Sequence, residues 1–414
     1  MATERDLRPL TLESDWDPHS PEALADPFAM HARLRAECPV AYSDRWDGFY
    51  TLTRYADVVA ASRDTETFTA TKQTVIPASP RKGLPRLPLQ KDPPEHGRYR
   101  SGLNFFFKEK RVRSMEARLR ETAIDLMKTM LSGRMPAEYG TGFAGPFTLW
   151  TICDMVGLDR GEGELLGELS HAYVQAVQSA DLSSAGELSR RIDGFAIDIV
   201  AGRKAEPRDP ETDMVTGLMR IQPEDGAYDD TELAGMIRLM LIGGHVVPRN
   251  FLCSAAWHLA NDHALQQRLR TEPALMRPLI EELLRCYSPN QALVRRTTRE
   301  VEIGGRHIPE DCPVALNFLS ANRDEEVFTD PDRFDPERSP NRHIAFGMGP
   351  HICIGMSVAR LQARIALETL VSMTRSFRMT GEPAWARGAQ AAWAAASGSR
   401  SRSATRMRAR GGRG

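Results

Sequence analysis

A lone cysteine lies in a glycine-rich decapeptide near the end of the chain, residues 346–355, which reads Phe-Gly-Met-Gly-Pro-His-Ile-Cys-Ile-Gly. Its Gly and Pro residues predict a tight loop, and the apolar run after Gly355 predicts a helix. A cysteine at a helix start has its thiolate favoured by free amide N–H groups and the helix dipole. Glycines also let the backbone approach a large, flat group. The pattern therefore favours a thiolate at Cys353 beside a large, flat group, the alternative being a buried structural cysteine.

The spacing Phe-x-x-Gly-x-x-x-Cys-x-Gly, filled by Phe346, Gly349, Cys353 and Gly355, resembles the haem-thiolate loop of the cytochromes P450. The resemblance implies haem b with Cys353 as axial iron ligand, O2 as cosubstrate, and Phe346, Gly349 and Gly355 at the cofactor. It implies the P450 fold, which is mainly α with small β-sheets and holds the haem between distal and proximal helices. We expect a single domain of this fold over residues 1–390.

Composition excludes several other classes of protein. The net charge of −1 gives no general attraction to nucleic acid or membranes. Six scattered cysteines without a C-x-x-C pair do not indicate a disulfide scaffold and are typical of a reducing cytoplasm. The first residues contain no apolar run, so we expect neither signal peptide nor membrane anchor. These features predict a soluble, cytoplasmic, monomeric enzyme that receives electrons from separate proteins.

The order of predicted elements fits this fold. Residues 48–53 predict a strand that leads into a helix over 55–62, and residues 75–94, rich in Pro, Lys and Arg, predict a long loop. In the family this loop lies over the substrate. Long helices are expected from 111 to 285, and short strands at 301–303 and 314–318.

The last residues, 391–414, differ from the family pattern. They are rich in Ala, Ser, Gly and Arg, which predicts a disordered basic tail. P450s usually end in a β hairpin with an apolar strand, and we expect no such strand after Trp393. Two explanations stay open, a natural truncation with a replacement tail and a late change of reading frame; recruitment of an acidic partner by the tail is a weaker third.

A Glu-x-x-Arg motif precedes the cysteine loop. Glu282 and Arg285 lie three residues apart, which places both side chains on one face of a helix. In P450s a later arginine joins this pair, and Arg338 is the matching position. We expect this triad to support the haem pocket structurally.

The two propionates of haem require cationic partners. His96 and Arg100 resemble the His-x-x-x-Arg helix start of the family, and Arg295 and His351 complete the predicted set. Arg296, next to Arg295, leaves an ambiguity of one residue.

The distal helix departs from the family. The family pattern Ala/Gly-Gly-x-Asp/Glu-Thr corresponds to Gly243, Gly244, His245, Val246 and Val247, so valines replace the acid and the alcohol that deliver protons during oxygen activation. The two glycines are expected to leave room for O2. Pro248 has no N–H, so the carbonyl four residues earlier is free to hold a water molecule.

The sequence therefore predicts a P450 monooxygenase that oxidises a small organic molecule of secondary metabolism, with electrons from NAD(P)H through ferredoxin reductase and ferredoxin. The valines favour an alternative outcome: aryl or C–C coupling, desaturation, nitration or peroxide-driven oxidation. A third possibility is a non-catalytic, P450-like docking module. Basic residues at 98, 108 and 110 are candidates for ferredoxin docking. Candidate substrate contacts are residues 75–89, 173–177, 240, 247, 249, 250 and 292–294.

Overall fold

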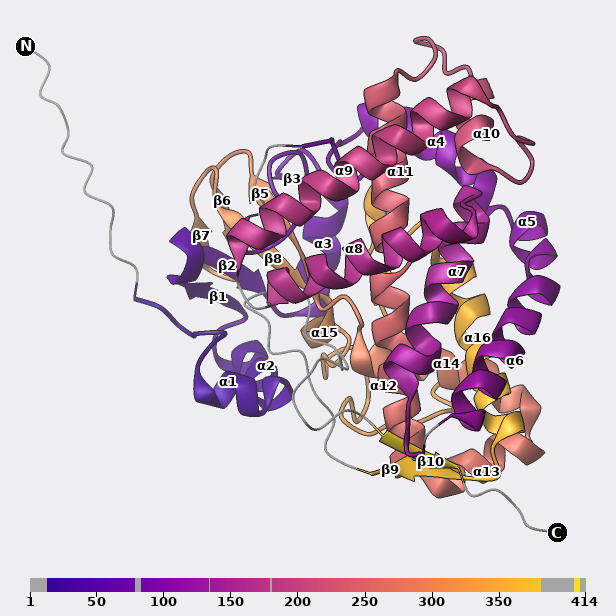
Figure 1. Ribbon diagram of the computed structural model, residues 1–414. Coiled ribbons are helices and arrows are strands. Elements are labelled where there is room, and N and C mark those ends of the chain that lie inside the picture. Colours follow the sequence, from indigo (N-terminus) through magenta and orange to yellow (C-terminus); the bar gives the residue numbers. More distant parts are fainter. Residues whose placement is uncertain (1–12, 79–82, 134, 179–180, 381–405, 410–414) are drawn as a thin grey trace, which may run out of the picture.

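The computed structural model describes residues 13–78, 83–133, 135–178, 181–380 and 406–409. A large helical part lies beside a smaller part that contains the main sheet and the N-terminal helices (Figure 1). The helices are α1 Pro21–Ala25, α2 Pro27–Glu37, α3 Tyr55–Arg63, α4 Glu95–Asn104, α5 Glu109–Ser114, α6 Glu116–Ser132, α7 Gly145–Val156, α8 Arg160–Gln178, α9 Leu182–Ala205, α10 Met214–Arg220, α11 Asp230–Gly243, α12 Val246–Asn261, α13 His263–Thr271, α14 Met276–Tyr287, α15 Phe318–Ala321 and α16 Met356–Met373.

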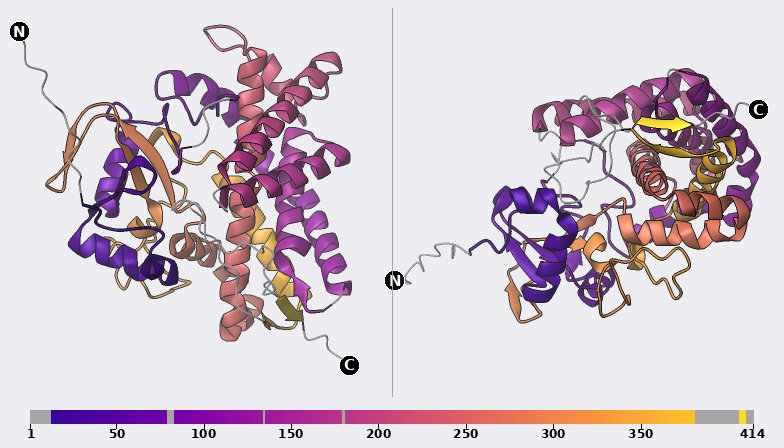
Figure 2. Two further views of the ribbon diagram at one scale, coloured as in Figure 1. Left: turned by 60° about the vertical axis from the view of Figure 1, so that its left-hand side comes forward. Right: turned by 90° about the horizontal axis from the view of Figure 1, so that it is seen from below.

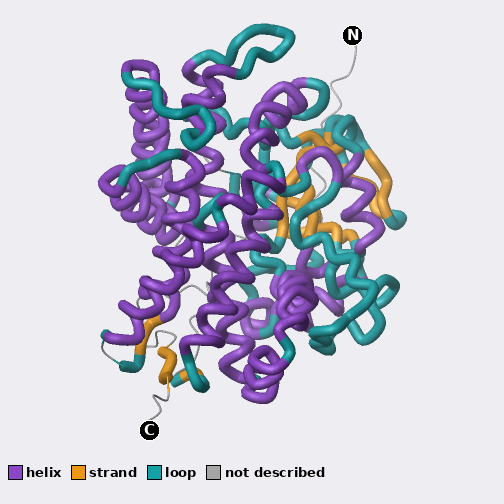
Figure 3. The backbone as a smooth tube through the Cα atoms, turned by 90° about the vertical axis from the view of Figure 1, so that its right-hand side faces the viewer, coloured by secondary structure: helices purple, strands orange, loops and turns teal. Residues whose placement is uncertain are grey.

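The strands form three sheets. They are β1 Val40–Ser43, β2 Phe49–Leu52, β3 Phe68–Thr69, β4 Ala137–Glu138, β5 Ala292–Thr297, β6 Val301–Ile303, β7 Arg306–Ile308, β8 Pro313–Asn317, β9 Phe377–Met379 and β10 Arg406–Ala409. The main sheet has the order β1-β2-β8-β5-β3, and β2 pairs with β8 in parallel. A second sheet has the order β4-β10-β9, and β6 pairs with β7 as a hairpin. The main sheet and the second sheet lie on opposite sides of the helical part (Figure 3).

The helical core places α11, α12 and α16 at its centre. α16 packs against α6, α12 and α14, and α11 packs against α7 and α9. Figure 2 shows the same helices from two further sides, with the main sheet beside them. α11 begins with a capping box, in which Asp229 and Glu232 each accept a hydrogen bond from the other's backbone N–H. The apolar side chains of these helices form one continuous buried cluster, which fixes the helix starts that carry the site.

Most predicted elements are present. The strand at 48–53 is β2, the helix after it is α3, and the described residues between 75 and 94 contain no helix or strand. The long helices and both later strands are also confirmed, while the β7 strand was not predicted.

The end of the chain differs from the prediction. Residues 406–409, Arg-Met-Arg-Ala, form β10, which pairs with both β4 and β9, so the prediction of a disordered tail is wrong there. Backbone pairing between strands does not require apolar side chains. β10 contains two arginines and is not the apolar strand whose absence was expected. The rest of the predicted tail, residues 391–405 and 410–414, lies outside the described residues, and the domain boundary at 390 stays a prediction.

Of the helices in the described ranges, none has the length and apolar character needed to cross a bilayer.

Candidate functional site

The cysteine loop folds back on itself before α16 begins. The N–H of Cys353 donates to the carbonyl of Phe346 at 2.8 Å, and Gly355 is the N-cap residue of α16. Gly349 has a φ of +72°, and a Cβ there would lie 2.5 Å from the carbonyl oxygen of Ser62 in α3. Gly349 therefore fixes the loop against α3. It does not border the cavity described next, which corrects its predicted contact with a cofactor.

The electrostatics of Cys353 differ from the prediction. Burial raises the pKa of its thiol, and the backbone hydrogen bond from Gly355 and the nearby charges of Arg100 and Arg360 only partly offset this. The helix start alone does not favour the thiolate, because Cys353 lies ahead of the first helical turn and desolvation of its sulfur opposes ionisation. A metal cation in the adjoining space would supply the missing stabilisation.

An apolar cavity of about 280 Å³ lies between the cysteine loop and the junction of α11 with α12. Cys353, Phe346 and Gly355 line it from the proximal side, and Gly243, Gly244 and Val247 line it from the distal side. The other walls come from α4, α7, α11, α14, α16, β5 and the loop before α4; their lining members include Pro88, Leu89, Thr151, Ile152, Leu239, Met240, Leu293 and Ala363.

Three of the four predicted propionate partners border this cavity: His96, Arg100 and His351. The rings of His96 and His351 lie 4.6 Å apart, and Arg100 donates to the carbonyl of Ile352 at 2.7 Å. The Nε2 atom of His96 is buried and has no hydrogen-bond partner among the described residues. Burial and the neighbouring His351 lower the pKa of His96 to about 4. An acceptor such as a carboxylate would complete this cluster.

Arg295 lies behind the cavity wall. Its side chain is 3% exposed and donates to the carbonyl of Val294, and burial lowers its pKa to about 10. Arg296 instead binds Asp311 at 3.0 Å near the surface. Of the two neighbouring arginines, Arg295 therefore has the buried side chain and matches the predicted position, whereas the side chain of Arg296 lies near the surface.

Asp92 was not predicted as a site residue. Its carboxylate accepts hydrogen bonds from Thr69, Ala70 and His351, the last at 3.2 Å. Burial opposes its ionisation, but these bonds outweigh burial and lower its pKa. Asp92 thus orients the His351 ring beside the cavity. The sequence feature that could have identified Asp92 is its position four residues before His96, at the start of Asp-Pro-Pro-Glu.

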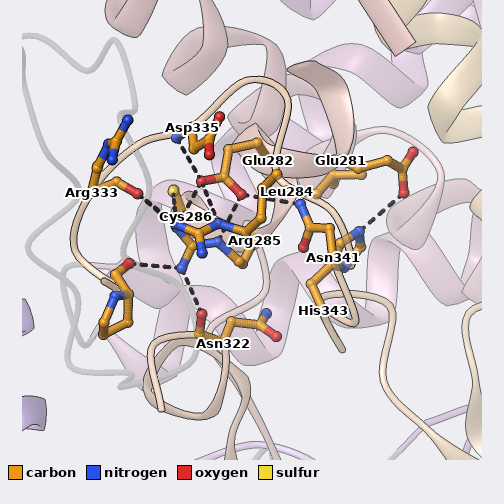
Figure 4. A network of polar contacts seen from close by, with 12 residues as sticks. Glu281, Glu282, Leu284, Arg285, Cys286, Asn322, Arg333, Asp335, Asn341 and His343 are labelled. Atoms are coloured by element: carbon orange, nitrogen blue, oxygen red, sulfur yellow. Dashed lines mark hydrogen bonds and ion pairs between the residues drawn. The ribbon is translucent and has the colours of Figure 1, made fainter. Parts of the chain in front are cut away.

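The predicted triad forms a buried network (Figure 4). Arg285 donates to both carboxylate oxygens of Glu282 at 2.8 Å, and both side chains are 0% exposed. Arg338 donates to the same carboxylate at 3.1 Å. Glu282 also accepts from the N–H of Asp335 and from Asn341. The network joins α14 to the segment that leads into the cysteine loop; its predicted role in supporting a haem pocket stays a prediction.

A second network beside it was missed by the sequence analysis. Glu281 accepts hydrogen bonds from His343 at 3.0 Å and from Arg360 at 2.7 Å, so it joins α14 to α16 (Figure 4 shows the contact with His343). Burial opposes ionisation of Glu281, but the hydrogen bonds and charges of these partners outweigh it and lower its pKa to about 2. Glu281 belongs to no motif of its own; it directly precedes Glu282 of the Glu-x-x-Arg motif.

The distal helix is interrupted. α11 ends at Gly243 and α12 begins at Val246, with a break at Gly244 and His245. A Cβ on Gly243 would meet open space, whereas a Cβ on Gly244 would lie 2.7 Å from Ile152. Gly243 thus supplies room at the cavity, and Gly244 allows α7 to pack closely.

The two distal valines have different environments. Val247 borders the cavity, but Val246 is 4% exposed and belongs to the buried helical core, so its predicted place in the oxygen pocket is wrong. Neighbouring residues of an α-helix are rotated by about 100°, so the two valine side chains point in different directions. His245 contacts Thr148 at 3.0 Å, away from the cavity, and burial lowers its pKa to about 3. Its imidazole is neutral and does not border the site.

Three further candidates are also placed elsewhere. Arg249 lies against the turn at Gly140 and Gly145, and Asn250 is buried; neither lines the cavity. Arg98 is engaged by Asp225 and, at 3.1 Å, by Glu232. Sequence periodicity alone could not distinguish these positions.

Comparisons with known proteins agree with this geometry. A family model described as Cytochrome P450 matches residues 177–381. Cytochrome P450 109 of Bacillus spizizenii is 32% identical, covering 86% of this chain and 86% of that protein. The erythromycin C-12 hydroxylase of Saccharopolyspora erythraea is 32% identical, covering 82% and 85%. The structure of P450BioI in complex with an acyl carrier protein ligated to hexadec-9Z-enoic acid has a TM-score of 0.81 at 26% identity, covering 90% of this chain and 97% of that one.

A cysteine that opens into an apolar cavity with a cationic edge defines a haem-thiolate enzyme. The orphaned Nε2 of His96, the buried Arg295 and the free thiol of Cys353 fit the propionates and the iron of haem. The chain belongs to the cytochrome P450 family. It is a monooxygenase oxidoreductase, and the family acts on small organic substrates with haem iron and O2.

Proposed function

We propose that this P450 inserts one oxygen atom into a C–H bond of a small secondary metabolite. Electrons come from NAD(P)H through ferredoxin reductase and ferredoxin, and the enzyme works as a cytoplasmic monomer. The observation that carries the proposal is the position of Cys353 in an apolar cavity with a cationic edge. The erythromycin hydroxylase among its relatives supports a secondary-metabolite substrate.

In this proposal Cys353 holds the haem iron, and His96, Arg100, Arg295 and His351 hold its propionates. Haem with a thiolate ligand supplies oxygen activation with O–O cleavage. Phe346 and Gly355 border the macrocycle from the proximal side, and Gly349 keeps the loop in place against α3.

On the distal side, apolar residues hold the substrate and exclude water. Leu239, Met240 and Leu293 line the cavity, and Gly243 leaves space beside them. Burial of such surface contributes about 25 cal/mol per Å².

Proton delivery needs a different route from the family's acid and alcohol. Residue 248 is proline and cannot donate to the carbonyl of Gly244, which lies at the break beside the cavity. We propose that a water molecule on this carbonyl, or a polar group of the substrate, delivers the proton. A Val247→Thr variant tests this by the ratio of product to NAD(P)H consumed. A ratio within about twofold of the wild type supports the proposal, whereas a gain of about tenfold shows that the wild type lacks a working relay.

A second candidate function follows from Val247. Without an alcohol at the cavity, coupling, desaturation, nitration or peroxide-driven oxidation is the alternative. Turnover with ferredoxin and its reductase is to be compared with turnover by hydrogen peroxide. Higher turnover with peroxide would favour the second candidate.

The carbon monoxide difference spectrum of the reduced protein tests haem ligation itself. A thiolate-type Soret band that Cys353→Ser abolishes is the expected result. Absence of the band in the wild type would exclude both enzymatic functions. A non-catalytic, P450-like docking module would then be the remaining interpretation.

Ferredoxin is expected to bind near Cys353. Lys108, whose ammonium lies 5.1 Å from the ring centre of Phe105, and Lys110 on α5 remain candidates. Arg98 is not a candidate for ferredoxin docking, because Asp225 and Glu232 already neutralise its charge.

A further inference from the structure

A second cavity, of about 370 Å³, adjoins the apolar one and has a different chemistry. It lies between the loop before α4 and the helices α9 and α11, and most of the residues that line it are polar. We name it the polar cavity.

The two cavities share a wall. Arg238 lines the polar cavity, and the next two residues of α11, Leu239 and Met240, line the apolar cavity. The loop before α4 is divided in the same way, with Gln90 on the polar side and Leu89 on the apolar side. One ligand can therefore contact both cavities.

The cations that line the polar cavity already have partners. Arg238, whose side chain is 4% exposed, donates to Asp193 at 2.5 Å. Lys72 is paired with Asp311 at the rim, at 2.8 Å. Arg86 also has partners, and it lies within electrostatic reach of Asp193. These charges therefore do not require a bound anion.

Thr74 is different, because its hydroxyl has no partner. It lines the polar cavity and is 2% exposed, and its Oγ1 atom is buried without a hydrogen bond to any described residue. Its carbonyl accepts the N–H of Val294 at 3.0 Å, and Leu293, one residue earlier, lines the apolar cavity. Thr74 thus lies beside the wall between the cavities. A buried hydroxyl without a partner destabilises the protein, so a ligand atom that pairs with it would bind favourably.

Two neighbouring side chains in this cavity can donate further hydrogen bonds. The hydroxyl of Ser189 accepts from Arg238 at 2.9 Å, which leaves its hydrogen able to donate. The amide oxygen of Gln90 accepts from the N–H of Arg86 at 2.8 Å, and the NH2 group of the same amide remains able to donate. The polar cavity therefore suits a ligand group that accepts hydrogen bonds.

We propose that the polar cavity binds an uncharged oxygen of the substrate, in a carbonyl or hydroxyl group, through the hydroxyl of Thr74, while the apolar body of the substrate extends into the cavity beside Cys353. The inference rests on the proposed function and specifies its substrate class as uncharged, mainly apolar molecules with an oxygen function at one end. A carboxylate in this place would lie near Asp193 and be repelled by it. The hydrogen bond would orient the substrate, so that a carbon remote from this oxygen is oxidised.

Thr51 allows a matched control. It lies in β2, is 2% exposed, and its Oγ1 atom is also buried without a hydrogen bond to any described residue. It borders neither the polar nor the apolar cavity. If an unpaired threonine hydroxyl is only a feature of packing, the variants Thr74→Val and Thr51→Val should behave alike.

The experiment uses haem-loaded enzyme and isothermal titration calorimetry. The probes share one apolar body and differ at its end: 4-phenylbutan-2-one, 4-phenylbutan-2-ol, 4-phenylbutanoate and butylbenzene. The oxygen preference is the affinity for the ketone or the alcohol divided by the affinity for butylbenzene. Thr74→Val should lower this preference roughly 5- to 10-fold, because one hydrogen bond is lost. Thr74→Ser, which keeps the hydroxyl, and Thr51→Val should retain the wild-type preference, and 4-phenylbutanoate should bind more weakly than the ketone.

Thermal unfolding without a ligand gives a second measurement. Since each valine replaces an unpaired buried hydroxyl, Thr74→Val and Thr51→Val should both melt at or above the wild-type temperature. A lower melting temperature for Thr74→Val than for Thr51→Val would show that the hydroxyl of Thr74 already has a partner in the free enzyme, and the proposal would be wrong.

Three calorimetric results would also overturn the proposal. They are an oxygen preference that Thr74→Val leaves unchanged, tighter binding of 4-phenylbutanoate than of the ketone, and no binding of either oxygenated probe to the wild type. None of these readings depends on turnover. A normal carbon monoxide spectrum together with any of them would refute the polar-cavity proposal alone and leave the proposed function intact.

Discussion

Replacing Glu282 tests how much the buried ion pair with Arg285 stabilises the folded protein. The change is Glu282→Gln, which keeps the size of the side chain and removes its charge. In the native protein Glu282 and Arg285 are both 0% exposed and joined by two hydrogen bonds of 2.8 Å. Arg285 keeps its bonds to the carbonyls of Asn322 and Pro331 in the variant, but it loses its counterion.

The expected cost follows from that burial. Removing one partner of a buried ion pair costs about 3–5 kcal/mol, because an uncompensated charge stays in the interior. Gln can still accept one hydrogen bond, so we expect the lower end, about 3 kcal/mol. Glu109→Gln is the matched control. It breaks a helical pair with Arg113 whose side chains are 78% and 76% exposed, and such pairs contribute less than about 1 kcal/mol.

The measurement is urea unfolding of the haem-loaded enzymes, followed by tryptophan fluorescence. A double variant, Glu282→Gln with Arg285→Met, removes both charges of the fully buried pair and should be more stable than Glu282→Gln alone, because the guanidinium of Arg285 no longer lacks its counterion; Arg338, which also loses Glu282, keeps its bonds to the carbonyls of Thr329 and Arg333. If Glu282→Gln and Glu109→Gln lower the free energy of unfolding equally, the buried network is not the stabilising element described above.

Three further predictions follow from other contacts. Glu281 has its pKa lowered from 4.5 to about 2, so its contribution of roughly 3 kcal/mol is complete above pH 4.5 and is lost as the pH falls to 2; Glu281→Gln should flatten stability over that window in acid-unfolding curves. Gly349→Ala places a Cβ against α3 at a positive φ, and it should cost about 2–4 kcal/mol in urea unfolding and lower haem retention on gel filtration. Arg98→Gln should lower the melting temperature, since the contact with Glu232 is lost, and should leave the KM for ferredoxin unchanged in steady-state assays.

The parts of the site that the sequence predicted correctly depend on short spacings. The loop around Cys353 and the pair Glu282–Arg285 each lie within ten residues, so local backbone geometry decides which side chains meet. The contacts that could not be predicted from the sequence join segments that are far apart along the chain. His351 meets Asp92, and Arg360 meets Glu281, and neither pairing has a periodicity that one sequence could reveal.

The ion pair between Arg238 of α11 and Asp193 of α9, behind the loop before α4, could not be predicted for the same reason. A buried arginine and an exposed arginine look alike in a sequence, and only tertiary packing shows that Arg238 and Asp193 form a pair behind the loop.

The distal prediction was half right because Val246 and Val247 are neighbours at the start of α12. Successive residues of an α-helix are rotated by about 100°, so the two side chains point in different directions. Val246 then packs in the core and His245 turns to Thr148. The missing acid therefore needs no replacement at position 246, because a carboxylate there would be buried in apolar surroundings rather than exposed to the cavity. In the proposed function, a water molecule on the carbonyl of Gly244 or a polar group of the substrate therefore delivers the proton, because the side chain of Val247 has none to donate.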